Sequence, residues 1–107
     1  MPDFAWSTGQ YGVGYESTAG ADDLIATEVA DGACFSTSTC PSSVYTRTDF
    51  WIDTPALVEN MFLGVDYDDG YIAWINGIEV FRSAEMPTGV PLWNSVPGSH
   101  EYSNGAV

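Results

Sequence analysis

Positive charge is almost absent from this chain. Its 107 residues contain two arginines, no lysine and one histidine against 15 aspartates and glutamates, which gives a formal net charge of −13. Nucleic acids are bound largely through lysine and arginine, which displace the counterions of the phosphate backbone, so the composition argues against a nucleic-acid partner. An anionic membrane surface is disfavoured for the same reason. Most of the carboxylates must therefore be solvated, spaced apart, protonated or neutralised by a bound cation.

Long apolar runs are also missing. No stretch approaches the roughly 18 apolar residues of a membrane helix, so no membrane insertion is predicted. Low hydrophobicity, which disorder requires together with high charge, is not found either, because 45% of the residues are apolar and 14% are aromatic. A folded core is expected.

Cysteine is scarce. Cys34 and Cys40, with the single histidine, are too few for the four ligands of a typical structural zinc site, and their spacing is not the Cys-x-x-Cys of a redox pair. Six positions apart in a Ser/Thr-rich stretch, they favour a local disulfide over both alternatives. A disulfide predicts an extracellular, secreted or cell-surface protein.

Helical periodicity is nearly absent, and the pattern is typical of an all-β domain. Residues 22–30 are the best helix candidate, but they fit an extended segment equally well. Elsewhere short apolar runs are separated by Gly, Pro, Ser and Asp. The candidate strands are residues 45–52, 61–67, 71–75 and 78–82, with a single turn expected between the first two, where Pro55 stops the strand.

Asn76-Gly77 lies between two apolar runs and is the strongest hairpin signal, because a type I′ turn needs positive φ at both central residues. It predicts a register in which the pairs are Ile75–Ile78, Trp74–Glu79, Ala73–Val80, Ile72–Phe81 and Tyr71–Arg82. We expect the small aliphatic face of this hairpin, which carries Ala73, Ile75, Ile78 and Val80, to form the core of a sandwich. The opposite face, which carries Ile72, Trp74 and Phe81, would then be covered by loops or by a partner.

The run VDYDDGYIAWINGIEVFR at residues 65–82, followed by Met86-Pro87 and Ser99-His100-Glu101, resembles galactose-binding-domain-like modules of bacterial extracellular proteins. GVGY at residues 12–15 and YTRTDF at residues 45–50 look like upstream segments of the same modules. The resemblance implies an all-β, antiparallel jelly-roll sandwich, with residues 1–107 forming a single domain or the N-terminal portion of one. It also implies a non-catalytic carbohydrate-binding or adhesion module, with a polysaccharide or glycan as partner.

Modules of this kind continue with further strands beyond the segment that ends here at Val107. The resemblance therefore implies an incomplete sandwich with unpaired edges and an uncovered apolar face. The alternative function is a structural assembly subunit, in which a second protein fragment or an identical subunit supplies the missing strands.

Two acidic clusters are candidate calcium sites. The first comprises Asp66, Asp68 and Asp69, where a strand would place the first two on one side, about 6 to 7 Å apart. The competing interpretation is that Asp-Asp-Gly is simply a turn. The second comprises Glu16, Asp22 and Asp23, in a Gly-rich loop where the resemblance implies a structural Ca²⁺.

Among the four tryptophans, Trp93 is the best candidate for a flat sugar-binding platform, with Asn94 beside it. Trp51 and Trp74 lie in predicted strands and are expected to pack in the core. Arg47 and Arg82 are expected to neutralise carboxylates such as Asp49 and Glu79.

No catalytic residue is predicted. Ser99 and His100 are adjacent, so their side chains point to different sides of an extended chain, and no Gly-x-Ser-x-Gly elbow occurs.

Overall fold

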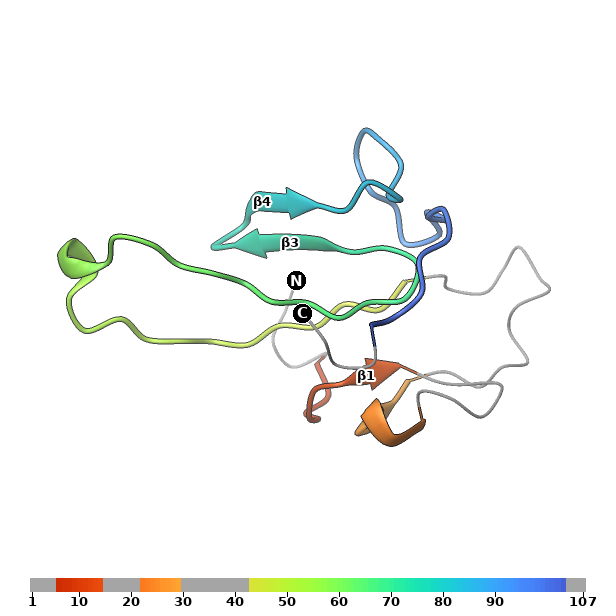
Figure 1. Cartoon of the computed structure of the whole chain (residues 1–107), viewed down its shortest axis with the longest axis horizontal. Coiled ribbons are helices and arrows are strands. Elements are labelled where there is room, and N and C mark those ends of the chain that lie inside the picture. The colour runs from red at the N-terminus through yellow and green to blue at the C-terminus, as the bar shows by residue number, and fades with distance from the viewer. Residues whose placement is uncertain (1–5, 15–21, 30–42, 104–107) are drawn as a thin grey trace. The chain divides into compact units, whose positions relative to one another are not determined.

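The structure is a computed structural model that describes residues 6–14, 22–29 and 43–103 (Figure 1). These residues form a β-rich fold with short strands in two small sheets. The chain divides into unit 1, Met1–Val44 with Leu92–Ser95, and unit 2, Tyr45–Pro91 with Val96–Val107. No helix in the described ranges has the length and apolar character needed to cross a bilayer.

Unit 1 contains a minimal parallel sheet. Strand β1 (Val13–Gly14) pairs with β2 (Thr27–Glu28), and the short 3₁₀ helix η2 (Asp22–Leu24) precedes β2. The Thr27 hydroxyl extends this pairing, since it donates to the Gln10 carbonyl at 2.7 Å and accepts the Gln10 N–H at 2.9 Å. The segment that begins at Asp22 is thus one 3₁₀ turn followed by an extended strand, with no α-helix among its described residues.

Unit 2 contains the predicted hairpin, formed by β3 (Ile72–Ile75) and β4 (Ile78–Arg82) (Figure 1). Asn76 and Gly77 have φ angles of 50° and 80°, as the type I′ prediction requires. The pairs Ile75–Ile78 and Trp74–Glu79 are confirmed.

Farther from the turn the predicted register is wrong. A β-bulge lies between Ala73 and Trp74, and beyond it Ala73 pairs with Phe81 and Ile72 with Arg82. Val80 is the extra residue of β4, which shifts every later pair by one position. Because side chains alternate along a strand, this one-residue shift also changes which β4 side chains lie on each face of the hairpin.

The predicted strands at residues 45–52 and 61–67 do not form strands. The outward arm (residues 45–53) is extended and leads to the 3₁₀ helix η4 (Pro55–Leu57), and the return arm (residues 59–65) leads back (Figure 1). The single turn expected at Pro55 is confirmed. Within the described chain, no backbone hydrogen bond reaches residues 48–53 or 59–65, so these two stretches lack the ladder that defines a strand.

The expected apolar core is not found among the described residues. None of their hydrophobic side chains is buried, and the one buried residue is Ser83, with 3% of its surface exposed. Ile78 and Val80, predicted to face a core, are exposed. Trp51 and Trp74, also predicted to be packed, are 86% and 43% exposed. A single hairpin presents too little surface to cover these side chains.

Aromatic stacking and short backbone bonds hold unit 2 together beside the hairpin. The Tyr67 ring stacks on His100 with a centroid distance of 4.0 Å, and Tyr71 stacks on Phe81 at 5.3 Å. The Asp69 N–H donates to the His100 carbonyl at 2.7 Å. The segment around His100 is thereby fixed against the loop that precedes β3.

Candidate functional site

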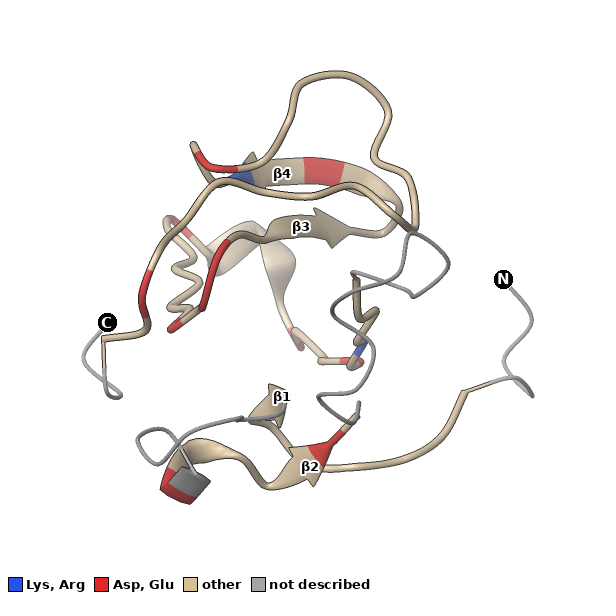
Figure 2. Cartoon of the chain, turned by 90° about the vertical axis from the view of Figure 1, so that its right-hand side faces the viewer, with Lys and Arg blue, Asp and Glu red and all other residues tan. Residues whose placement is uncertain are grey.

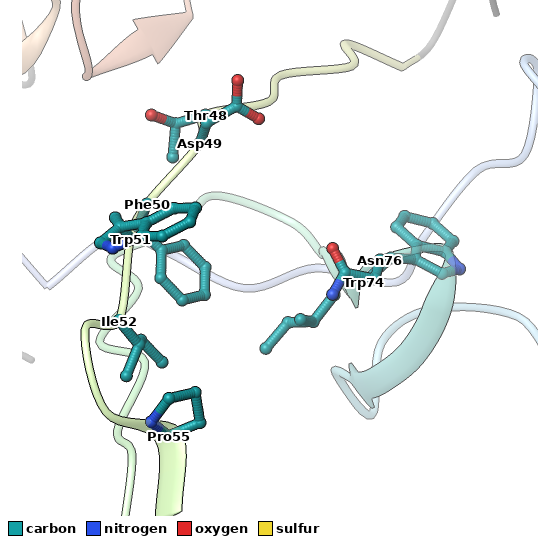
Figure 3. Close-up of a pocket in the computed structure, with 9 residues that line it drawn as sticks. Thr48, Asp49, Phe50, Trp51, Ile52, Pro55, Trp74 and Asn76 are labelled. Carbon is teal, nitrogen blue, oxygen red and sulfur yellow. The ribbon is translucent and has the colours of Figure 1, made fainter. Parts of the chain in front are cut away.

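An open hollow of about 410 Å³ lies in unit 2 between the outward arm and the hairpin turn (Figure 3). This volume is within the range of roughly 300–1,000 Å³ that is usual for small-molecule sites. Nine residues line it: Thr48, Asp49, Phe50, Trp51, Ile52, Pro55, Trp74, Ile75 and Asn76.

The first wall is the outward arm, which carries the aromatic part of the site. Figure 3 shows the rings of Phe50 and Trp51 together on this wall, with Pro55 below them where η4 begins. Both rings are largely exposed, and the Trp51 indole is the most exposed tryptophan side chain of the described residues. An aromatic surface of this kind is available to a ligand.

The second wall is the end of the hairpin. The left-handed backbone at Asn76 turns the chain there and places this residue at the hollow. In Figure 3 the Trp74 indole lies on the far side of Asn76 from the Phe50 and Trp51 rings. The outward arm therefore supplies the paired rings of Phe50 and Trp51, and the hairpin supplies the Asn76 amide together with Trp74 and Ile75.

The polar groups of the hollow are a carboxylate, a hydroxyl and an amide, from Asp49, Thr48 and Asn76. A carboxylate accepts hydrogen bonds from hydroxyl groups, whereas an amide and a hydroxyl both donate and accept. None of the nine lining residues is cationic. The hollow therefore suits a neutral ligand that has hydroxyl groups and one apolar face, and it disfavours an anion.

The Trp93 and Asn94 site predicted from sequence lies elsewhere, in unit 1. Both side chains are exposed at a turn that is closed by the Ser95 N–H to the Leu92 carbonyl at 3.0 Å. Ser43 Oγ donates to the Trp93 carbonyl at 2.6 Å and fixes this turn. The exposure of Trp93 agrees with a platform, and its ligand role stays a prediction.

The first candidate calcium cluster, Asp66, Asp68 and Asp69, lies in the segment that leads to β3. Asp66 accepts the Ser103 N–H, and Asp69 has a φ of 72° and donates its N–H to the His100 carbonyl, so the chain bends at Asp68 and Asp69. Figure 2 shows the acidic residues on several separate segments. The described residues contain no group of three His, Cys, Asp or Glu side chains placed to hold a metal ion. Calcium at this cluster stays a prediction.

Several predicted residues lie outside the described ranges. Glu16, the third member of the Glu16, Asp22 and Asp23 cluster, is one of them, and Cys34 and Cys40 are the others. Asp22 and Asp23 begin η2. Calcium at this loop and the disulfide stay predictions.

Arg82 neutralises Glu79, as predicted. Its Nη2 lies 2.6 Å from Glu79 Oε1, and its Nη1 donates to the carbonyls of Pro87 and Gly89. The guanidinium thus ties the loop after β4 to the hairpin.

Comparison with protein-family models, with curated proteins and with solved structures finds no match for this chain. The likeness to galactose-binding modules therefore rests on the sequence motifs alone.

Tyr67 and Glu85 form a titratable pair beside the His100 stack. Tyr67 Oη donates to Glu85 Oε2 at 3.2 Å. The backbone N–H of Glu85, together with hydrogen bonds from Ser83 and Tyr67, lowers the pKa of the Glu85 carboxyl. Burial and the Glu85 charge raise the pKa of the Tyr67 phenol.

These shifts predict a stability plateau for unit 2. Glu85 contributes to the free energy of unfolding above the ordinary carboxyl pKa of about 4.5, and this contribution is lost as pH falls through the lowered pKa of the folded state. Tyr67 contributes to the free energy of unfolding below about pH 10, the ordinary pKa of a tyrosine, and this contribution is lost as pH rises through the raised pKa of the folded state. When the melting temperature is measured as a function of pH, Glu85→Gln should reduce its fall at acid pH, and Tyr67→Phe should reduce its fall at alkaline pH. If both variants keep the pH dependence of the wild type, Glu85 and Tyr67 are not the groups responsible.

Proposed function

We propose that this chain is a non-catalytic carbohydrate-binding module of an extracellular protein, built as part of a jelly-roll β-sandwich, and that the hollow in unit 2 binds a neutral glycan. One observation carries the proposal: Trp51, 86% exposed, lines a hollow together with Asp49 and Asn76. The short antiparallel hairpin is compatible with the sandwich. The motif resemblance and the expected disulfide support the extracellular location.

The chemistry follows from the two kinds of surface on a sugar. A pyranose ring has an apolar C–H face and a rim of hydroxyl groups. The C–H face would lie on the Trp51 indole, and the hydroxyl groups would bond to Asp49 and Asn76. Covering an exposed aromatic side chain contributes about 2–3 kcal/mol to the free energy of binding. This is enough to supply most of the affinity when a glycan binds weakly through repeated sugar units.

A binding role is favoured over glycoside hydrolysis by the carboxylates of the hollow. Hydrolysis requires two carboxyl groups that flank the glycosidic bond. Asp49 is the one carboxylate among the nine lining residues. A single carboxylate can position a hydroxyl group, but it does not make the acid and base pair.

Affinity electrophoresis of the full chain in gels containing neutral polysaccharides (β-glucan, galactan or mannan), with polygalacturonate as the acidic counterpart, tests this proposal. We expect retardation by at least one neutral polymer. We expect Trp51→Ala to weaken the affinity for this polymer at least tenfold, because the loss of an anchoring aromatic side chain removes more than about 1.4 kcal/mol of binding free energy.

Two further variants make the result specific. Val90→Ala is the matched control, because Val90 is 85% exposed and does not line the hollow. Trp93→Ala tests the site predicted from sequence. If Trp93→Ala abolishes retardation while Trp51→Ala does not, the hollow is the wrong site. If no neutral polymer retards the wild type, the proposed function is wrong.

A further inference from the structure

The return arm has apolar side chains on both faces. Met61, Phe62 and Leu63 are consecutive and exposed, and Phe62 is 91% exposed. Successive side chains of an extended segment point to opposite faces, so neither face of this arm is polar. Apolar residues on both faces are typical of a strand that is covered on both sides inside a sheet. The arm therefore has the side chains of an internal strand without the neighbours of one.

The backbone of the return arm is equally unpartnered. In the part of the chain that the structure describes, no backbone hydrogen bond reaches residues 59–65. An extended segment with free N–H and C=O groups is a template for pairing with another strand. Pairing would also bring the side chains of the added strand next to Phe62 and its neighbours.

The negative charge near the return arm determines which kind of strand can pair with it. Asp53 and Glu59, on either side of η4, are exposed, and the described residues show no ion pair for them. A second copy of this chain would bring another formal charge of −13 to the same surface. Lysine or arginine side chains on the added strand would instead complement these carboxylates.

We propose that the return arm binds an extended segment of another polypeptide, one that alternates apolar with basic residues, by β-strand addition. The segment pairs its backbone with residues 59–65, covers Phe62, and places its basic side chains near Glu59. This site is separate from the glycan hollow, because none of the nine residues that line the hollow belongs to the return arm.

The test uses a fluorescent synthetic peptide of about ten residues that alternates valine with lysine or threonine, titrated into the full chain and followed by anisotropy. Two control peptides carry glutamate in place of lysine, or proline in place of two central valines. We expect saturable binding of the basic peptide and at least tenfold weaker binding of both controls. Absence of binding, or equal binding of the acidic peptide, would overturn the proposal.

Variants of the chain locate the site. Phe62→Ser should weaken peptide binding at least tenfold, whereas Val90→Ser, at a residue that is also largely exposed, should not change it. Trp51→Ala should leave peptide binding intact, which separates this proposal from the glycan site. Equal losses in Phe62→Ser and Val90→Ser would contradict the proposal. So would sedimentation showing that the chain alone self-associates through the arm and that Phe62→Ser abolishes this association, since the occupant would then be a second copy.

Discussion

Replacing Gly70 with alanine is expected to destabilise unit 2 by about 1–3 kcal/mol, the usual effect of overpacking a close contact. A Cβ atom at this position would lie 2.9 Å from Pro97 Cβ and 2.9 Å from Met86 Sδ. The Met86 thioether can rotate away. The Pro97 ring is rigid, so the contact is relieved only by moving the segment that follows it.

That movement should reach the stacked rings of unit 2. Gly98, next to Pro97, donates its N–H to the Glu85 carbonyl at 2.7 Å, and His100 accepts the Asp69 N–H two residues later. Displacing this segment would lengthen both bonds and separate the Tyr67 and His100 rings. Local opening of unit 2 should therefore become easier, with a loss of amide protection.

Hydrogen exchange at the Asp69 and Gly98 amides measures this effect. A loss of 1–3 kcal/mol corresponds to protection lower by roughly 5- to 150-fold. Gly98→Ala is the matched control, because no atom lies closer than 3.6 Å to a Cβ built there. Equal protection in the two alanine variants would show that the contact at Gly70 is not tight.

The hairpin could be predicted from sequence because its determinants are local. Asn76 and Gly77 adopt left-handed backbone that few other residues tolerate, and this alone sets the pairs on either side of the turn. The bulge at Val80 was not predictable, since no glycine or proline marks it. A register shift of this kind depends on how each face packs, which a single sequence does not show.

The arms were mispredicted for a different reason. Residues 45–52 and 61–67 have the composition of strands, but a strand exists only where another segment pairs with it. The prediction that Trp51 is packed depended on that pairing and was wrong for the same reason. The sequence signal that points to the hollow is the run of Asp49, Phe50 and Trp51, with polar and aromatic groups adjacent. It becomes informative only when the arm is known to be uncovered.

Removing the Ser83 hydroxyl is expected to have the second large effect, because Ser83 is the one buried residue that the structure describes. Its Oγ accepts the Tyr71 N–H at 3.1 Å, and its own N–H donates to the Tyr71 carbonyl at 3.0 Å. These two bonds continue the hairpin beyond Arg82, where the β3–β4 ladder ends. Ser83→Ala leaves the Tyr71 donor without its acceptor, at a cost of about 1–3 kcal/mol.

The position of Ser83 makes this variant a test of how the fold supports the site. Ser83 lies at the open end of the hairpin and Asn76 at its turn, so Ser83→Ala should reduce protection of the Tyr71 and Ser83 amides while glycan retardation persists. Ser99→Ala, at an exposed serine, is the control for hydroxyl loss. Should Ser83→Ala abolish retardation as completely as Trp51→Ala does, the hollow would depend on the whole hairpin. If only amide protection falls, the turn alone positions Asn76, and the type I′ geometry predicted from Asn76-Gly77 is sufficient to build that wall of the hollow.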